Sequence, residues 1–167
     1  MHMHGAAMDS EVYSVDNPLS LEDTIVYRIA VATNVNTSLW QRRYGKRFDL
    51  TITDWRVLML LASHPGMSAV EVSETLAVDK MTITRSVKRL LARKCIRART
   101  NPGDRRRLAL TIAPAGAAIY NEVAPEALSY QEHLLQDLSA AERLMLRDLL
   151  GKLLVAGRRM ANADSAS

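Results

Sequence analysis

At residues 68–111 the chain reads SAVEVSETLAVDKMTITRSVKRLLARKCIRARTNPGDRRRLALT, in which two helix starts precede a hairpin pattern. Ser68 and Glu71 have the spacing of a capping box, which predicts a short helix. Asp79 is the next N-cap candidate, and the apolar residues after it recur every three or four positions, as in an amphipathic helix. From residue 96 the apolar residues alternate with polar ones around a turn at 101–104, which is typical of a β-hairpin.

A short helix, a tight turn and a second helix with an exposed polar face form a helix-turn-helix, and the hairpin after it is a wing. The second helix has the right size to enter the major groove of DNA. We expect Arg85 to bond a guanine bidentately, and Thr82 or Met81 to meet a thymine methyl group. The predicted DNA-binding residues of this helix are Lys80, Met81, Thr82, Thr84, Arg85, Lys88 and Arg89, and Ser86 is expected on the same exposed face.

The hairpin has an arginine-rich rim. Its arginines are suited to DNA phosphates, and one at the tip, Arg105 or Arg106, can enter a narrow, electronegative minor groove. The predicted wing residues at the DNA are Arg97, Arg99, Asp104, Arg105, Arg106 and Arg107.

Basic charge is concentrated in this part of the chain. The 29 residues from Asp79 to Arg107 hold eleven Lys or Arg and two Asp, a net charge of +9. The whole chain has a net charge of +4, so the remainder is acidic, at −5. This concentration favours a DNA-binding element over a solvated charge run.

Further helices flank the helix-turn-helix. One is predicted over about 20–43, and a second begins at Thr51, which is an N-cap with Asp54 at the third helical position. A long helix is expected from about Thr111 or Pro114 towards Leu138, and Pro125 should kink it because proline removes an internal hydrogen bond.

The whole chain is therefore expected to be mainly α with a small β-hairpin wing. Ser139 and Glu142 form another capping box, which starts a leucine-rich last helix. The first and last helices have more apolar surface than a winged helix needs, so we expect a homodimer with recognition helices about 34 Å apart on a palindromic operator. The expected divisions are a disordered tail at 1–18, an N-terminal dimerisation helix at 19–49, a DNA-binding lobe at 50–112, C-terminal dimerisation helices at 113–160 and a disordered tail at 161–167.

The recognition-helix stretch 76–90, the wing signature 104–111 with Ala115-Gly116, and the helix start 138–142 resemble MarR-type regulators. The resemblance covers roughly residues 19–159. It implies a dimer that represses, or sometimes activates, promoters and is often released by a small molecule. It also implies that Asp104 pairs with a wing arginine. Cys95 stands where the family usually has a glycine in the left-handed conformation, a departure that implies another cap geometry or mild strain.

The resemblance places an effector pocket where the dimerisation helices meet the DNA-binding lobe. The residues expected there are Trp40, Arg43, Tyr44, Trp55 and His64, although Trp55 also fits the core. Aromatic rings and one cation suit an aromatic carboxylate or a phenol.

Other functions have less support in the sequence. Non-specific DNA packaging and a winged-helix protein-interaction module stay as alternatives, but the polar, basic recognition face favours base readout. No glycine-rich phosphate loop, nucleophile elbow or zinc-ligand spacing is present, so no enzyme, cofactor or metal is expected. The single Cys95 is interpreted as a buried apolar residue rather than a redox sensor. The absence of a secretory signal or a membrane span suggests a cytoplasmic protein.

Overall fold

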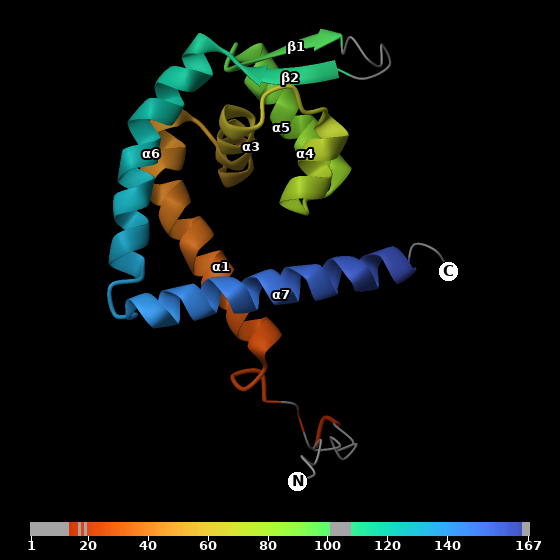
Figure 1. The fold of residues 1–167 in the computed structure, drawn as a ribbon, viewed down its shortest axis with the longest axis vertical. Helices are drawn as coiled ribbons and strands as arrows, with labels where there is room; N and C mark the ends of the chain where they lie inside the picture. Colours follow the sequence, from red (N-terminus) through yellow and green to blue (C-terminus); the bar gives the residue numbers. More distant parts are fainter. Residues whose placement is uncertain (1–13, 17, 19, 101–107, 165–167) are drawn as a thin grey trace.

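The computed structural model describes residues 14–164 except 17, 19 and 101–107. It is mainly helical with one antiparallel pair of strands, as expected (Figure 1). The elements are α1 Ile25–Trp40, the π-helical turn η1 Gln41–Gly45, α2 Lys46–Phe48, α3 Ile52–Ser63, α4 Ala69–Leu76, α5 Lys80–Ala92, β1 Ile96–Thr100, β2 Leu108–Ile112, α6 Pro114–Leu134 and α7 Ala140–Asp164.

Local capping explains why several helices begin where the sequence predicts. The Ser68 hydroxyl accepts from the backbone N–H of Glu71, and the Glu71 carboxylate accepts from the Ser68 backbone N–H at 2.7 Å. The same reciprocal pair forms between Thr51 and Asp54. Asp79 accepts from the Thr82 backbone N–H at 2.8 Å. Each cap satisfies N–H groups that a helix start leaves without an internal partner.

The core lies where α3, α4 and α5 meet the hairpin and α6. Leu58 of α3 and Ile83 and Leu90 of α5 are completely buried there. The ring of Trp55 on α3 stacks on Tyr120 of α6 at a centroid distance of 5.7 Å. These contacts hold the helix-turn-helix as one lobe against α6.

The base of the hairpin is tied to the turn between α3 and α4. Ile96 pairs with Ile112 at one end of the register and Thr100 with Leu108 at the other. Leu110 exchanges backbone hydrogen bonds with Gly66 and Met67, each at 2.8 Å. The strands are therefore fixed to the lobe, while residues 101–107, which include the turn predicted at 101–104, lie outside the described residues.

The end of α5 corrects the expectation about Cys95. The left-handed residue is Lys94, at φ 56°, and not Cys95. The backbone N–H of Cys95 reaches Leu90 O and that of Lys94 reaches Leu91 O, both at 2.9 Å, which is a Schellman motif. The motif buries Cys95, and burial raises the pKa of its thiol despite nearby Arg93, which argues against the redox-sensor alternative.

A π-helical turn interrupts the helix that the sequence predicts over 20–43. The turn covers Gln41–Gly45, and α2 follows it directly. A Cβ at position 45 would lie only 2.0 Å from Nε2 of Gln41, so the glycine makes room for that side chain. Gln41 in turn donates to Leu50 O at 3.3 Å. Such turns occur frequently at functional sites.

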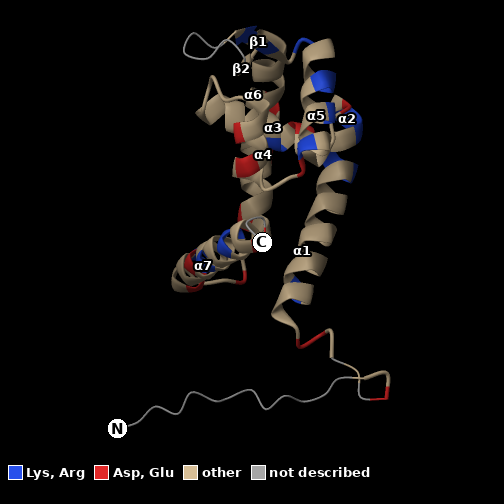
Figure 2. Cartoon of the chain, turned by 90° about the vertical axis from the view of Figure 1, so that its right-hand side faces the viewer, with Lys and Arg blue, Asp and Glu red and all other residues tan. Residues whose placement is uncertain are grey.

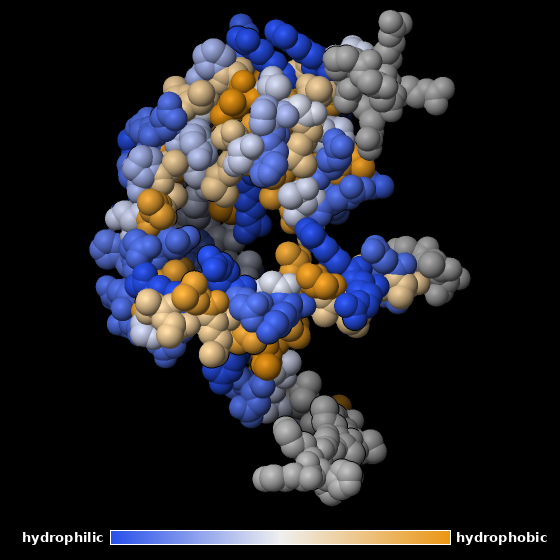
Figure 3. All heavy atoms as spheres, in the orientation of Figure 1, coloured by the Kyte–Doolittle hydropathy of each residue, from blue (hydrophilic) through white to orange (hydrophobic). Residues whose placement is uncertain are grey.

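The two outer helices leave most of their apolar surface uncovered. Figure 1 shows α7 crossing beneath the lobe, and Figure 3 shows hydrophobic residues gathered on that part of the molecule. Helix α7 is long and extends to Asp164, yet none of its residues is buried. Only Trp40 is buried in α1. The exposed apolar residues of the two helices include Ile25, Val26, Ile29, Leu146, Leu149, Leu150, Leu153 and Leu154.

Helix α6 continues through Pro125 as a single element. Within the described part of the chain, no helix has the length and apolar composition required to cross a membrane.

Candidate nucleic-acid interface and adjoining cavity

Helix α5 presents a polar face to solvent and an apolar face to the core. Ile83, Val87 and Leu90 are buried, as the periodicity predicts. Met81, at the start of the helix, is 67 % exposed although it is a large apolar side chain. The other predicted contact residues that are exposed on α5 are Lys80, Thr84, Arg85, Lys88 and Arg89, while Thr82 is half-buried.

The first turn of α5 is held in order by its own side chains. Arg85 Nη2 donates to Thr82 Oγ1 at 3.1 Å, and the Thr84 hydroxyl donates to Lys80 O at 2.7 Å. The hydrogen bonds from Thr82 to Asp79 hold the pKa of that carboxyl below its ordinary value. The N-terminal end of α5 is therefore capped and presents an ordered Arg85 to solvent.

Ser86 differs from the prediction, while Arg89 is exposed as expected but has an ion-pair partner that the sequence does not predict. Ser86 is buried, not exposed, and its hydroxyl donates to Asp54 Oδ1 at 2.6 Å. Arg89 bonds the same carboxylate through Nε and Nη2, at 2.9 and 2.7 Å. The sequence identifies Asp54 only as a helix cap, because its second set of partners lies more than 30 positions along the chain.

The wing adds exposed cations beside α5. Arg97 and Arg99 are exposed on β1, and the alternation places both on the side opposite Ala98. Figure 2 shows Lys and Arg at the hairpin and around α5. The remaining predicted wing residues, Asp104, Arg105, Arg106 and Arg107, lie outside the described residues, and their roles stay predictions.

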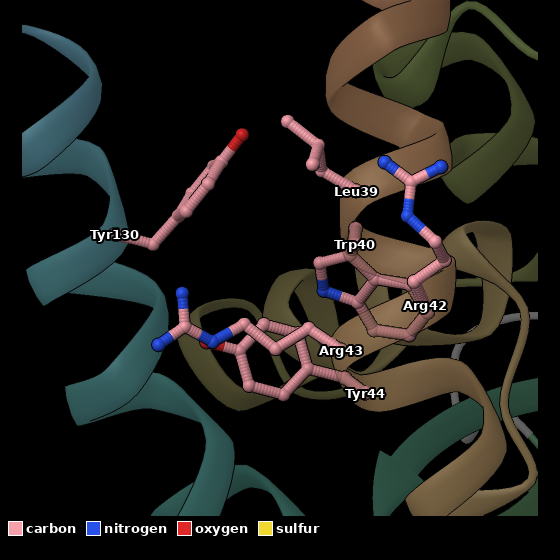
Figure 4. A pocket seen from close by; sticks show the side chains of 6 residues that line it. All are labelled: Leu39, Trp40, Arg42, Arg43, Tyr44 and Tyr130. Carbon is pink, nitrogen blue, oxygen red and sulfur yellow. The ribbon is translucent and has the colours of Figure 1, made fainter.

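A cavity lies between the π-helical turn and α6 (Figure 4). It has a volume of about 230 Å³ and is lined by Leu39, Trp40, Arg42, Arg43, Tyr44 and Tyr130. The rings of Trp40 and Tyr44 are tilted by 47° at a centroid distance of 5.8 Å. The Arg43 guanidinium lies 5.9 Å from the centre of the Tyr44 ring. The cavity thus combines aromatic walls with two cationic side chains.

Two polar atoms are buried at this cavity without a hydrogen-bond partner among the described residues. They are Trp40 Nε1 and the Tyr44 hydroxyl, in side chains that are 8 % and 1 % exposed. Burial raises the pKa of Tyr44, with a smaller opposing effect of Arg43, so the hydroxyl remains a donor. An unpaired buried donor costs free energy that a ligand acceptor can recover.

The predicted effector residues are only partly brought together. Trp40, Arg43 and Tyr44 line the cavity, whereas Trp55 is buried against Tyr120 and His64 is exposed at the end of α3. The sequence missed Leu39, Arg42 and Tyr130, which the fold brings to the same cavity. The Tyr130 hydroxyl donates to Asn36 Oδ1 at 2.7 Å. Tyr130 follows Tyr44 by 86 positions, so no local pattern could have joined them.

Known proteins resemble this chain over most of its length. Residues 48–107 match the sequence model of the MarR family. The chain is 31 % identical over 129 residues to the multiple antibiotic resistance protein MarR of Salmonella typhimurium, covering 76 % of this chain and 89 % of that protein. It is 29 % identical over 141 residues to the HTH-type transcriptional repressor NicR of Pseudomonas putida, covering 84 % of this chain and 89 % of that protein.

Solved structures show the same fold. A MarR/EmrR family regulator from Acinetobacter matches with a TM-score of 0.78 and 25 % identity, covering 84 % of this chain and 99 % of the other. Bordetella bronchiseptica BpsR, whose DNA binding is regulated by 6-hydroxynicotinic acid, matches with a TM-score of 0.73 and 27 % identity, covering 81 % of this chain and 96 % of the other.

Proposed function

Because the chain belongs to the MarR family of transcriptional regulators, we propose that it is a dimeric, sequence-specific DNA-binding repressor that a small aromatic carboxylate releases from its operator. The observation that carries the DNA-binding part is the exposed face of α5. Met81 and Arg85 are exposed to solvent there, in the N-terminal half of a helix whose opposite face is buried.

In this proposal the N-terminal half of α5 lies in the major groove. Arg85 bonds a guanine, and Met81 or the Thr82 methyl contacts a thymine. Lys80, Lys88 and the wing arginines bind phosphates. An arginine of the wing tip enters the minor groove, where a narrow, A·T-rich groove attracts it.

A second copy of the chain is the proposed partner of α1 and α7. An apolar groove runs along α1 from Ile25 to Trp40 and includes Leu134, Leu146 and Leu150 from α6 and α7. Exposed apolar surface of this extent is typical of an interface. A dimer with a two-fold axis through this groove would present two recognition helices, and these would match the two half-sites of a palindromic operator.

The cavity beside the π-helical turn is the proposed effector site. Its volume of about 230 Å³ suits a single aromatic ring. Arg42 or Arg43 would bind a carboxylate, and the Trp40 and Tyr44 donors would bind oxygen or nitrogen acceptors on the ring. The BpsR structure, whose DNA binding is regulated by 6-hydroxynicotinic acid, supports a hydroxylated pyridine carboxylate as the first compound to test.

Selection of genomic fragments by the purified protein tests the DNA-binding proposal. We expect a palindromic consensus that binds at least 1000-fold more tightly than random DNA at one fixed salt concentration, roughly the lower limit for specific regulators. Equal affinity for both would support the alternative of non-specific packaging. No affinity for either would support a protein-interaction module.

Titration with an aromatic panel tests the effector proposal. Benzoate, salicylate, 6-hydroxynicotinate and phenol are added while tryptophan fluorescence and operator release are recorded. Trp40 lines the cavity, so a ligand there should change its emission. No response to any compound would remove the effector from the proposal while leaving DNA binding untouched.

A further inference from the structure

The carboxylate of Asp54 accepts five hydrogen bonds from described residues of the lobe. Asp54 is completely buried at the start of α3. Its Oδ2 accepts from the backbone N–H and the hydroxyl of Thr51, both at 2.8 Å. The remaining bonds come from α5, through the Ser86 hydroxyl at 2.6 Å and the fork of Arg89. One carboxylate therefore joins the cap of α3 to the recognition helix.

The position of Arg89 makes this pairing relevant to DNA binding. In an α-helix a residue four positions on is displaced by about 40° around the axis and about 6 Å along it. Arg89 therefore shares the solvent face of α5 with Arg85, one turn further from the N-terminus. Its side chain is still 41 % exposed, while that of Asp54 is completely buried. Among the residues that the structure describes, the only other acceptor for its guanidinium is Thr51 Oγ1, which accepts from Nη2 at 3.0 Å.

We propose that Asp54 is a specificity-determining positioning residue, which fixes the rotation of α5 through Ser86 and Arg89 and withholds the Arg89 guanidinium from DNA phosphates. The inference rests on the proposed DNA-binding function and extends it to a residue that touches no base. Non-specific affinity comes from cations on phosphates, whereas specificity needs the base-reading side chains in one orientation. The pairing of Arg89 with Asp54 lowers non-specific affinity, because it removes a phosphate contact. It also supports specificity, because it orients Arg85.

Asp54→Asn tests the proposal, since the amide keeps the shape of the side chain but loses its charge. We expect tighter binding to random DNA, with a log–log salt slope steeper by about 0.9 because the freed Arg89 reaches a phosphate. We also expect the ratio of operator to random affinity to fall by at least about fivefold, the low end of the cost of one mismatched base pair. A role in stability alone would weaken binding to both DNAs.

Two further variants separate orientation from folding. Arg89→Gln should leave the salt slope unchanged and still lower the affinity ratio, whereas Lys88→Gln should flatten the slope by about 0.9 and keep the ratio. Asp54→Asn combined with Arg89→Gln should restore the wild-type slope but not the ratio. Glu142→Gln removes a capping carboxylate of the same kind on α7 and should change neither quantity.

All variants are compared below their melting temperatures, as followed by circular dichroism. A salt slope that falls by about 0.9 in Arg89→Gln would show that Arg89 itself contacts DNA and would overturn the inference. An unchanged affinity ratio in both Asp54→Asn and Arg89→Gln would overturn it as well. A wild-type protein without any preference between operator and random DNA would instead refute the proposed function.

Discussion

Replacing Tyr44 by phenylalanine should stabilise the free protein and weaken effector binding at the same time. The Tyr44 hydroxyl is buried without a partner among the described residues. Removing such a group abolishes its desolvation cost, so the free energy of unfolding should rise by about 1–3 kcal/mol. For a chain of this size each 1 kcal/mol corresponds to roughly 2–4 °C in Tm. Loss of the donor should in turn reduce affinity for a ligand acceptor by about 0.5–1.5 kcal/mol.

Tyr130→Phe is the matched control, because Tyr130 lines the same cavity but its hydroxyl is bonded to Asn36 at 2.7 Å. Its loss should lower the free energy of unfolding by about 0.5–1.5 kcal/mol. The two variants are melted with and without 6-hydroxynicotinate, and ligand binding is measured by calorimetry. Destabilisation of the free protein by Tyr44→Phe would mean that its hydroxyl is already bonded, and the argument for a poised donor would fail.

Four other results are expected. Arg85→Ala should cost about 1–3 kcal/mol of operator affinity and relax preference at one base position, whereas Lys88→Ala should weaken all sequences about equally in the same binding assay. Leu150→Glu should yield a monomer by light scattering, since Leu150 lies in the apolar groove, and an unchanged dimer would place the interface elsewhere. Although burial alone would raise the pKa of Asp54, its hydrogen bonds with Arg89, Ser86 and Thr51 hold that pKa below the ordinary 3.8. The stability that this carboxylate contributes is therefore present above about pH 4 and is lost as the pH falls further. Denaturant titrations at different pH values should show that the free energy of unfolding falls less steeply with acid in Asp54→Asn than in the wild type. Arg106→Ala should cost more affinity for an operator with A·T-rich flanks than for one with G·C-rich flanks, and an equal loss would reduce its role to phosphate contact.

Local signals were sufficient for much of the fold. The capping boxes of α3 and α4 and the period of α5 each depend on residues within a few positions of one another. The same locality explains why Trp40, Arg43 and Tyr44 could be grouped from the sequence, since they lie within five positions. The family resemblance implies that grouping, and the fold adds Tyr130 to it.

The other features depend on contacts that local sequence patterns do not encode. The sequence could not show that Arg89 pairs inward, because Asp54 is 35 positions away and already had a role as a cap. His64 does not line the cavity, because it lies at the C-terminal end of α3 and is exposed there. The π-helical turn depends on the side chain of Gln41 folding over Gly45, a packing detail that helical periodicity does not encode.

The absence of buried residues on α7 has a consequence for gene dosage. The helix buries none of its residues against the chain that carries it, so in the proposed dimer each chain is complete only when paired. At low abundance the number of pairs then varies with the square of the number of chains. Halving the expression of the gene would remove about three quarters of the pairs in that regime. Promoters under its control would therefore respond to its expression level more steeply than promoters under a monomeric regulator.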